Sequence, residues 1–342
     1  MDGKINIREI ARELGCSPST VSRVLSGHDG RIRIGEKTRR RILDYCAQRD
    51  YRPSIHAGRF FSRRSRTIGF LSDGGLTGDD TNLSRSLFTV CRELFERGYR
   101  CLPLLNSGSF VETREFLEIF KRGEIDALLV WGASESCGYL REVQEAGEPF
   151  LLLGNRFLDF PAVYVNQFRP AFELASHCRG QGAGRFVILN YPVGDSYLQR
   201  QAGFEAALAG CEIKFIASEQ NRWRGYELVP EIMSYAPDAV LCGNDDTAIG
   251  VERGLLELGV KIPGDILLTG GDNIPGADYC PVPLSSFDLR AEESAVAAVA
   301  MVVDHLDHGG AIESKVLESE IFYRQSSLKN GSVPPRCREN ER

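Results

Sequence analysis

The sequence of 342 residues contains no apolar stretch of the roughly 18 residues that a membrane-spanning helix requires. Its longest candidate, Ala295 to Val303, is far shorter. The N-terminus also lacks the basic-then-apolar pattern of a secretory signal. From these absences we expect a soluble protein that stays in the cytoplasm.

Paired cysteines and clustered histidines are also missing. The ten cysteines form no CxxC pair, and most lie in apolar runs, so we expect reduced core residues rather than a disulfide framework. Of the five histidines only His305 and His308 are close, and no Cys or carboxylate partner for them is identifiable. Metal-ligand and nucleophile-elbow spacings are therefore absent, and no metal or cofactor is expected.

Charge is distributed unevenly along the chain. Residues 1–66 carry 16 Lys and Arg against 7 Asp and Glu, a formal charge of +9, whereas the remaining residues carry 25 against 40, a formal charge of −15. Lys and Arg neutralise phosphates and supply most non-specific affinity for nucleic acids. The pattern favours a nucleic-acid partner for the basic head alone, with a solvated charged face as the alternative.

After Arg66 the pattern changes to short apolar runs that alternate with amphipathic stretches. This alternation is typical of repeated βα units around a parallel sheet, an α/β fold in which ligands bind beyond the carboxyl ends of the strands. The predicted strands are 68–71, 127–130, 150–153, 186–189, 239–242 and 266–269. The predicted helices between them include 84–97, 170–179, 199–209, 225–235 and 247–258.

The basic head begins with two short helical patterns. Asn6 and Glu9 form a capping-box start, Gly15 ends the first helix, and Ser17-Pro18 starts the second with an N-cap and a proline at its first position. Two short helices joined by a glycine turn predict a helix-turn-helix, with a structural helical hairpin as the alternative.

Several motifs make this prediction specific. They are 19–25 (STVSRVL), 38–39 (TR), 51–54 (YRPS), 67–69 (TIG), 243–250 (GNDDTAIG), 262–265 (IPGD), 271–273 (GDN), 283–286 (PLSS) and 324–327 (RQSS). By these motifs the chain resembles the LacI/GalR family of bacterial repressors from about residue 5 to residue 328. The loop 27–34 is longer than in the lactose repressor, and similar long loops occur in the branch that resembles the evolved β-galactosidase repressor.

The resemblance implies a helix-turn-helix head and a two-lobed, periplasmic-binding-protein-like body with doubly wound parallel sheets. The chain is expected to cross between the lobes near Asn166, Asp288 and Glu318. The implied boundaries are a DNA-binding domain over 1–51, a hinge helix over 52–65, an effector-binding and dimerisation domain over 66–328 (near lobe 66–165 and 289–318; far lobe 166–288 and 319–328) and a polar tail over 329–342.

The resemblance also implies which head residues bind DNA. Arg23 is the best reader of base edges, because a guanidinium can pair bidentately with guanine. Phe60 falls where the family drives an apolar wedge between base pairs, with burial against the core as the alternative. The remaining candidates are Pro18 and Ser19 at base edges, Ser17, Ser22 and Thr38 near phosphates, and Tyr51.

Four body residues match the family's effector contacts, and Trp223 is a fifth candidate. Arg200, Asn244, Asp272 and Asn155 offer the guanidinium, carboxylate and amides that sugar hydroxyls require. Trp223 offers an apolar platform or ordinary interlobe packing. The alternatives are an Arg200–Asp272 pair across the cleft and a turn role for Asn155. Gly154 stands where some members place an Asp, and the neighbouring Arg156 suits a charged or phosphorylated effector instead.

An enzyme is the competing class, because Asp245-Asp246 resembles a carboxylate pair. Adjacent residues point to opposite faces of a strand, however, whereas glycosidase carboxylates must flank a bond. We therefore expect no catalysis. The expected protein is a homodimeric transcriptional repressor that binds a pseudo-palindromic operator, pairs through apolar helix faces such as 83–95, and responds to a carbohydrate, a galactoside among the candidates. A purine or sugar-phosphate co-repressor is the alternative.

Overall fold

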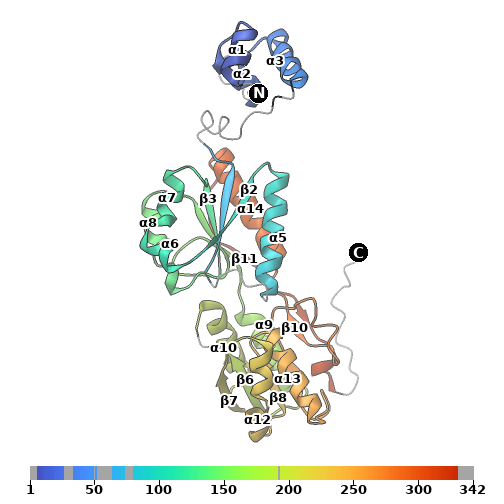
Figure 1. Ribbon diagram of the computed structural model, residues 1–342. Coiled ribbons are helices and arrows are strands. Elements are labelled where there is room, and N and C mark those ends of the chain that lie inside the picture. The colour runs from blue at the N-terminus through green and yellow to red at the C-terminus, as the bar shows by residue number, and fades with distance from the viewer. Residues whose placement is uncertain are drawn as a thin grey trace. The chain divides into compact units, whose positions relative to one another are not determined.

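A computed structural model describes residues 6–26, 34–49, 51, 64–73, 80–191 and 193–329. The chain divides into two compact units, residues 1–65 and 66–342 (Figure 1).

The described residues of the smaller unit form three helices, α1 (Ile7–Glu13), α2 (Pro18–Ser26) and α3 (Glu36–Gln48). The predicted capping box between Asn6 and Glu9 is present, and Gly15 follows α1 with a φ of +61°. The Ser17 hydroxyl accepts the Thr20 N–H, which caps α2. Helix α3 was not predicted, and it completes the core with Ile42 and Cys46.

The larger unit begins with a lobe built on a six-stranded parallel sheet in the order β11-β5-β4-β3-β1-β2 (Figure 1). Side chains from α5 and α14 pack on one face of the sheet, and side chains from α6, α7 and α8 pack on the other. The strands are β1 (Thr67–Ser72), β2 (Arg100–Leu105), β3 (Ala127–Trp131), β4 (Phe150–Gly154), β5 (Ala162–Val165) and β11 (Lys315–Leu317). The helices are α5 (Thr81–Glu96), α6 (Gly108–Glu112), α7 (Glu115–Lys121), α8 (Leu140–Glu145) and α14 (Ala291–His308), with the 3-10 turn η1 (Glu135–Cys137).

The second lobe holds a four-stranded parallel sheet in the order β7-β6-β8-β9 and an antiparallel pair, β10 with β12. Helices α9 and α10 cover one face of the larger sheet, and α11, α12 and α13 cover the other. The strands are β6 (Arg185–Asn190), β7 (Glu212–Ala217), β8 (Ala239–Cys242), β9 (Leu267–Thr269), β10 (Ser286–Phe287) and β12 (Ile321–Phe322). The helices are α9 (Phe168–Gly180), α10 (Asp195–Ala207), α11 (Arg222–Glu227), α12 (Val229–Ser234) and α13 (Asp245–Glu257), with η2 (Gln325–Ser327).

The chain passes between the lobes three times, between β5 and α9, between β10 and α14, and between β11 and β12. Asn166, Asp288 and Glu318 lie in these three connections. The six apolar runs predicted as strands are strands, and the α/β fold with parallel sheets is confirmed.

Two further expectations concern composition. Each of the nine cysteines within the described ranges is a free thiol. Among the described helices, none is both long and apolar enough to span a membrane.

Candidate effector cleft and DNA-binding face

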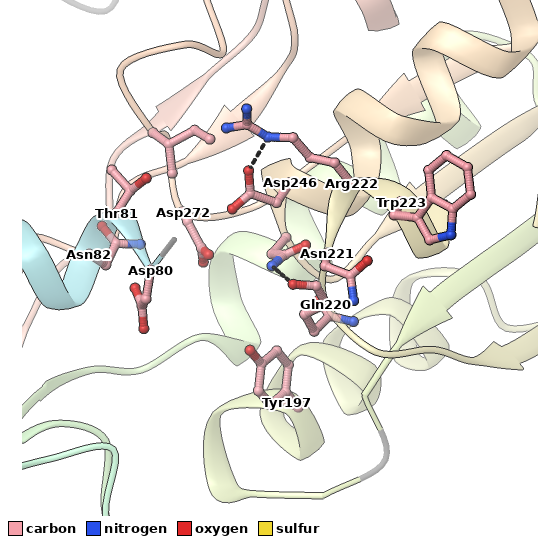
Figure 2. Close-up of a pocket in the computed structure, with 12 residues that line it drawn as sticks. Asp80, Thr81, Asn82, Tyr197, Gln220, Asn221, Arg222, Trp223, Asp246 and Asp272 are labelled. Carbon is pink, nitrogen blue, oxygen red and sulfur yellow. Dashed lines mark hydrogen bonds and ion pairs between the residues drawn. The ribbon is translucent and has the colours of Figure 1, made fainter. Parts of the chain in front are cut away.

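Two adjoining cavities of about 630 and 580 Å³ lie between the two lobes of the larger unit. Asp80 and Asn82, at the start of α5, line both cavities from the first lobe. Tyr197 from α10 and Asp272 after β9 line both from the second lobe (Figure 2). The cleft lies beyond the carboxyl ends of parallel strands, where open α/β sheets bind their ligands.

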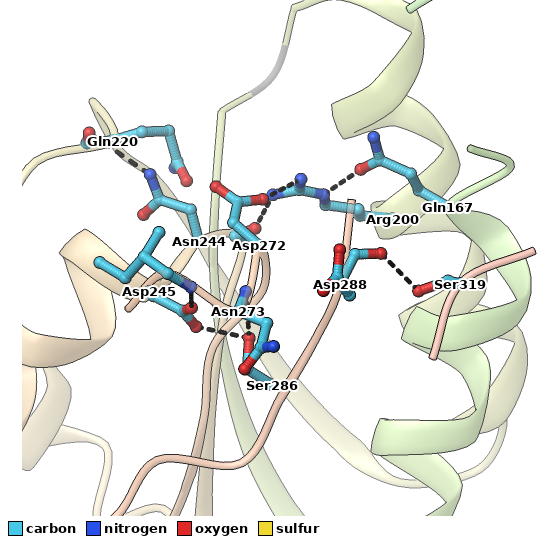
Figure 3. Close-up of polar contacts among 12 residues, drawn as sticks. Gln167, Arg200, Gln220, Asn244, Asp245, Asp272, Asn273, Ser286, Asp288 and Ser319 are labelled. Carbon is cyan, nitrogen blue, oxygen red and sulfur yellow. Dashed lines mark hydrogen bonds and ion pairs between the residues drawn. The ribbon is translucent and has the colours of Figure 1, made fainter. Parts of the chain in front are cut away.

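Arg200 is the centre of a buried polar network on the second lobe (Figure 3). Its side chain is 2% exposed and places Nη2 2.5 Å from Asp272 Oδ1. Its Nε donates to Gln167 Oε1, and its Nη1 donates to the carbonyl oxygen of Gly243. The Arg200–Asp272 pair therefore forms, but it lies within the second lobe and not across the cleft as the alternative had it.

Asp272 is held in an unusual backbone conformation, with a φ of +101°. Its N–H donates to the Phe287 carbonyl oxygen at 2.8 Å, which fixes the backbone there. Burial raises its pKa to about 6, against the opposing effect of Arg200, and the carboxylates of Asp80 and Asp246 raise it further. The result is a carboxylate at the wall shared by both cavities, engaged by a buried cation.

Asn244 caps a helix as well as lining the smaller cavity. Its Oδ1 accepts the Thr247 N–H at 2.9 Å, and its Nδ2 lies 3.5 Å from the Gln220 carbonyl oxygen. The residue is 7% exposed. Its carboxamide thus already has partners, and its contact with an effector stays a prediction.

Asn155 follows β4 and lines the larger cavity. Its Nδ2 donates to the Ala133 carbonyl oxygen at 2.6 Å, whereas its buried Oδ1 has no hydrogen-bond partner. The amide therefore combines a local structural contact with an acceptor atom that is free for a ligand.

Trp223 lies at the rim of the smaller cavity and is 67% exposed. Its ring stacks on Tyr226 with centroids 5.8 Å apart, and both residues belong to α11. Because both rings belong to the same helix, this contact is not the interlobe packing that was one of the two predicted roles of Trp223. The sugar platform stays a prediction.

Arg156 forms an ion pair with Asp195, with Nη2 3.0 Å from Oδ1. Arg156 comes from the first lobe and Asp195 begins α10, so the pair links the lobes beside the larger cavity. The guanidinium also lies over the Tyr164 ring, 5.2 Å from its centroid. This cation is already matched by a carboxylate, contrary to its predicted availability for a phosphorylated effector.

The sequence did not identify Asp80, Asn82, Tyr197, Gln167 or Gln220 as site residues. Asp80 carries a local signal, because it caps α5 by accepting the Leu83 N–H at 2.9 Å. That signal indicates a helix start and not a cleft. Gln167 and Gln220 lie in connections between elements, and only the folded chain brings them to the site.

A second polar group gathers after the first-lobe strands. Asp73, which follows β1, accepts hydrogen bonds from Asn106, Ser134 and Ser136. Although burial opposes it, these hydrogen bonds lower the pKa of Asp73. Asp73, Ser134 and Ser136 line the far end of the larger cavity.

Asp245 and Asp246 lie in the first turn of α13 and not on a strand, so the expected geometry was wrong. Asp245 is fully buried and accepts from the Ser286 hydroxyl and the Ile274 N–H, and burial raises its pKa well above the ordinary value. Asp246 instead lines the smaller cavity and pairs with Arg222 at 2.7 Å. The two carboxylates thus lie in different environments, one in the core and one at a cavity.

Among the described residues no cluster of His, Cys, Asp and Glu is arranged to hold a metal ion.

The candidate DNA-contacting residues of the smaller unit differ in exposure. Ser17, Pro18 and Ser19 are exposed at the start of α2, and Arg23 and Thr38 are half-buried. Ser22 is only 5% exposed, so its surface offers little support for the predicted phosphate contact. Tyr51 packs against the three-helix core, which raises the pKa of its phenol by burial. Phe60 lies outside the described residues.

Two families match the chain in succession. Residues 6–54 match "Bacterial regulatory proteins, lacI family", and residues 175–327 match "Periplasmic binding protein-like domain". The regulator AscG of Escherichia coli is 25% identical, covering 94% of this chain and 97% of its own length. The repressor PurR of Klebsiella pneumoniae is also 25% identical, covering 88% of this chain and 90% of its own length.

Solved structures agree with this architecture. The Lac repressor dimer bound to operator and an anti-inducer aligns with a TM-score of 0.82 at 18% identity, covering 96% of this chain and all of its own. A complex of the regulator CelR with cellobiose aligns with a TM-score of 0.67 at 20% identity, covering 94% of this chain and 99% of its own. A helix-turn-helix unit followed by a two-lobed ligand-binding body defines a DNA-binding transcriptional regulator. This chain belongs to the LacI family of such regulators.

Proposed function

We propose that this protein is a homodimeric repressor that acts in the cytoplasm, where operator DNA lies, and whose operator affinity is set by a small carbohydrate in the interlobe cleft. The observation that supports the effector part of this proposal is the Arg200–Asp272 pair, in which Asp272 lines both cavities and Arg200 lines the larger one. A carboxylate beside a guanidinium and several amides suits paired hydroxyl groups, because each hydroxyl both donates and accepts.

The size and lining of the cleft support a carbohydrate. Cavities of about 630 and 580 Å³ fall in the range of small-molecule sites. Structural neighbours of this chain hold cellobiose and, in a LacI-family regulator from Enterococcus faecium, ribose. A galactoside or a plant-type oligosaccharide is the finer proposal, which rests on the resemblance to galactosidase repressors.

The alternative effectors find less support. A phosphate needs a free cation, but Arg156 is paired with Asp195 and Arg200 with Asp272. A purine needs two facing rings, yet Tyr191 and Tyr197 stand edge to face with centroids 5.7 Å apart, too close to admit a base between them. Phe157 packs against the core of the first lobe. We therefore favour the carbohydrate.

Helix α5 supports the dimer. Leu83, Val90 and Leu94 on one side are buried against the sheet, whereas Phe88 and Phe95 on another side are 75% and 82% exposed. Two exposed phenylalanines seven residues apart lie on one helix face, and a second copy would cover them. Two heads related by a two-fold axis then imply two operator half-sites.

The DNA half of the proposal keeps its predicted residues. Pro18, Ser19 and Arg23 would face base edges in the major groove, Ser17 and Thr38 would lie near phosphates, and Phe60 would act as the minor-groove wedge. The domain limits proposed for this mechanism are 1–51 for the head, 52–65 for the hinge and 66–328 for the body. Effector binding would then change operator affinity through its different affinities for the two states of the body.

The test is a thermal-shift screen of the full chain against sugars, sugar phosphates and nucleobases. A ligand at about 100 times its dissociation constant stabilises the folded state by roughly 2.7 kcal/mol. We expect stabilisation by sugars alone, and a band-shift assay on operator selected from random duplexes then gives the sign of regulation. Stabilisation by nucleobases or sugar phosphates alone would overturn the carbohydrate proposal.

A further inference from the structure

The walls of the cleft contain buried hydrogen-bond acceptors that no donor among the described residues satisfies. Three buried carboxamide oxygens that belong to cavity-lining residues, Asn82 Oδ1, Asn155 Oδ1 and Gln220 Oε1, have no hydrogen-bond partner. The orientation of two of these amides is fixed, because Asn155 Nδ2 donates to Ala133 and Gln220 Nε2 donates to Ser218. A ligand that satisfies this cleft must therefore be rich in donors.

The charged side chains of the cleft also favour a ligand that donates hydrogen bonds. The carboxylates that line the cavities belong to Asp73, Asp80, Asp195, Asp246 and Asp272. Asp195, Asp246 and Asp272 each pair with an arginine. Within the described ranges neither Asp73 nor Asp80 forms an ion pair, so the site carries unbalanced negative charge.

Asp80 and Asp73 both accept hydrogen bonds but have no cationic partner among the described residues. Asp73 accepts hydrogen bonds at both carboxylate oxygens from Asn106, Ser134 and Ser136. Asp80 accepts from the Leu83 and Asn82 backbone and from the Trp131 side chain, and it lines both cavities together with Asp272 (Figure 2). Beside it Asn82 is 5% exposed and has an unpartnered Oδ1. Asp80 is thus the carboxylate without a cationic partner that a ligand in the middle of the cleft would meet.

We infer that the cleft selects a carbohydrate bearing a protonated amine, an amino sugar, whose ammonium group lies between Asp80 and Asp272. An ammonium donates three hydrogen bonds and accepts none, which matches a site with unsatisfied acceptors better than a hydroxyl does. Its charge also offsets the repulsion between carboxylates that share the cavity. This inference rests on the proposed carbohydrate effector and narrows its chemical class.

The test compares matched trios of ligands on the full-length protein by isothermal titration calorimetry at pH 7. Each trio holds an amino sugar, its N-acetyl form and its hydroxyl counterpart: glucosamine, N-acetylglucosamine and glucose; the galactose series; and the disaccharide series of chitobiosamine, diacetylchitobiose and cellobiose. In at least one trio we expect the amine to bind tenfold or more tightly than both neutral members.

The variant Asp80→Asn removes the charge and retains the cap, because Asn is as good an N-cap as Asp. It should reduce the amine preference to less than threefold. If the Asn variant melts early, Asp80→Ser is another capping substitution. Asp304→Asn removes an exposed carboxylate of α14 outside the cleft and should leave the preference intact.

The outcomes separate this inference from the proposed function. Neutral sugars that bind as tightly as their amines, or an Asp80→Asn variant that keeps the tenfold preference, would overturn the amino-sugar inference and leave the carbohydrate effector standing. A simple diamine, putrescine, that binds as tightly as the best amino sugar would overturn the sugar part of it. Absence of binding by every trio would overturn both.

Discussion

Asp272 joins an unusual backbone conformation to a carboxylate held by a buried cation. Its φ of +101° is disfavoured for residues other than glycine, and Asn and Asp tolerate positive φ better than most. Arg200 has three polar partners, Asp272, Gln167 and Gly243. Removing one partner of a buried ion pair costs about 3–5 kcal/mol, because the other charge is left uncompensated. The pair therefore fixes the cleft wall as well as offering atoms to an effector.

Replacement of Asp272 by Asn tests the shared site. Asn keeps the shape and tolerates the backbone, but it removes the charge that faces both cavities. We expect a folded protein that binds operator and no longer responds to effector. Thermal shift with ligand and a band-shift assay measure the two halves. A full effector response in this variant would remove Asp272 from the site.

The raised pKa of Asp272 gives a second residue-scale prediction, in which stability and effector affinity change with pH in opposite directions. Because burial raises its pKa from 3.8 to about 6, the native state binds a proton between those values and the unfolded state does not. The contribution of Asp272 to stability therefore falls as pH rises through this window. Effector binding that uses the carboxylate should instead weaken as pH falls below about 6.

As the pH rises from 4.5 to 7.5, the contribution of Asp272 should lower the melting temperature and raise the effector affinity. The Asp272→Asn variant should weaken both of these pH dependences. Other groups in the cleft need their own control. Withdrawal from water and the charge of Asp246 raise the pKa of Asp80, so Asp80→Asn is measured in parallel. Burial raises the pKa of Tyr197 to about 12, far outside the range. Parallel pH trends for stability and affinity would contradict the assignment.

At the scale of elements, α11 and α13 approach each other closely because of two glycines. A methyl group at Gly250 would overlap the carbonyl oxygen of Arg222, and one at Gly225 would overlap that of Thr247. Helix α11 carries Arg222 and Trp223 at the smaller cavity. The close approach therefore positions that side of the cleft.

Gly250→Ala should destabilise the larger unit by about 1–3 kcal/mol, the usual cost of overpacking. Gly180→Ala is the matched control, because Gly180 lies in α9 with no atom near its added methyl group. Alanine there should be neutral or stabilising by up to about 1 kcal/mol, since alanine favours helices. Chemical denaturation measures both. Equal stability of the two variants would show that α11 shifts freely.

The sequence predicted the strands that are continuous apolar runs and missed the others. Strands β1, β3 and β8 are buried on both faces and read as continuous apolar runs. The edge strands β2 and β7 have several exposed residues and include Arg100, Glu212 and Lys214, so no continuous run marks them. The short interior strand β5 was also missed. Helix α14 was read only as the apolar run Ala295 to Val303.

Part of the cavity lining could be predicted from single motifs. Asn244 and Asp272 lie in the motifs 243–250 and 271–273, Arg200 was named from the resemblance, and all three line the cavities, whereas their contact with an effector stays a prediction. Asp80 and Asn82 reach the site only because the lobes face each other, which no local pattern indicates. Asn is a common N-cap residue, so the helix-capping role of Asn244 could also have been predicted from the sequence, whereas the resemblance implied only an effector contact.

For the whole molecule, the proposal that the exposed face of α5 forms the dimer interface can be tested directly. The double variant Phe88→Asp/Phe95→Asp places two charges on the exposed face and should yield a monomer by sedimentation velocity. Operator affinity should fall about 100-fold or more, because the two heads no longer bind jointly. Phe172→Asp, at an exposed position of α9, is the control and should remain dimeric. A dimeric double variant would place the interface elsewhere.

Coupling between operator and effector gives the last prediction. In the proposed function the basic head binds operator and the acidic body binds effector, and linkage requires each ligand to change the affinity of the other by the same factor. We expect the ratio of operator dissociation constants with and without effector to equal the ratio of effector dissociation constants with and without operator. Fluorescence anisotropy and calorimetry at one salt concentration measure the two ratios. The equality holds whether the effector induces or co-represses, and Asp272→Asn should return the operator ratio to one. An effector that binds the cleft and leaves both ratios at one would make the cleft a site without regulatory function.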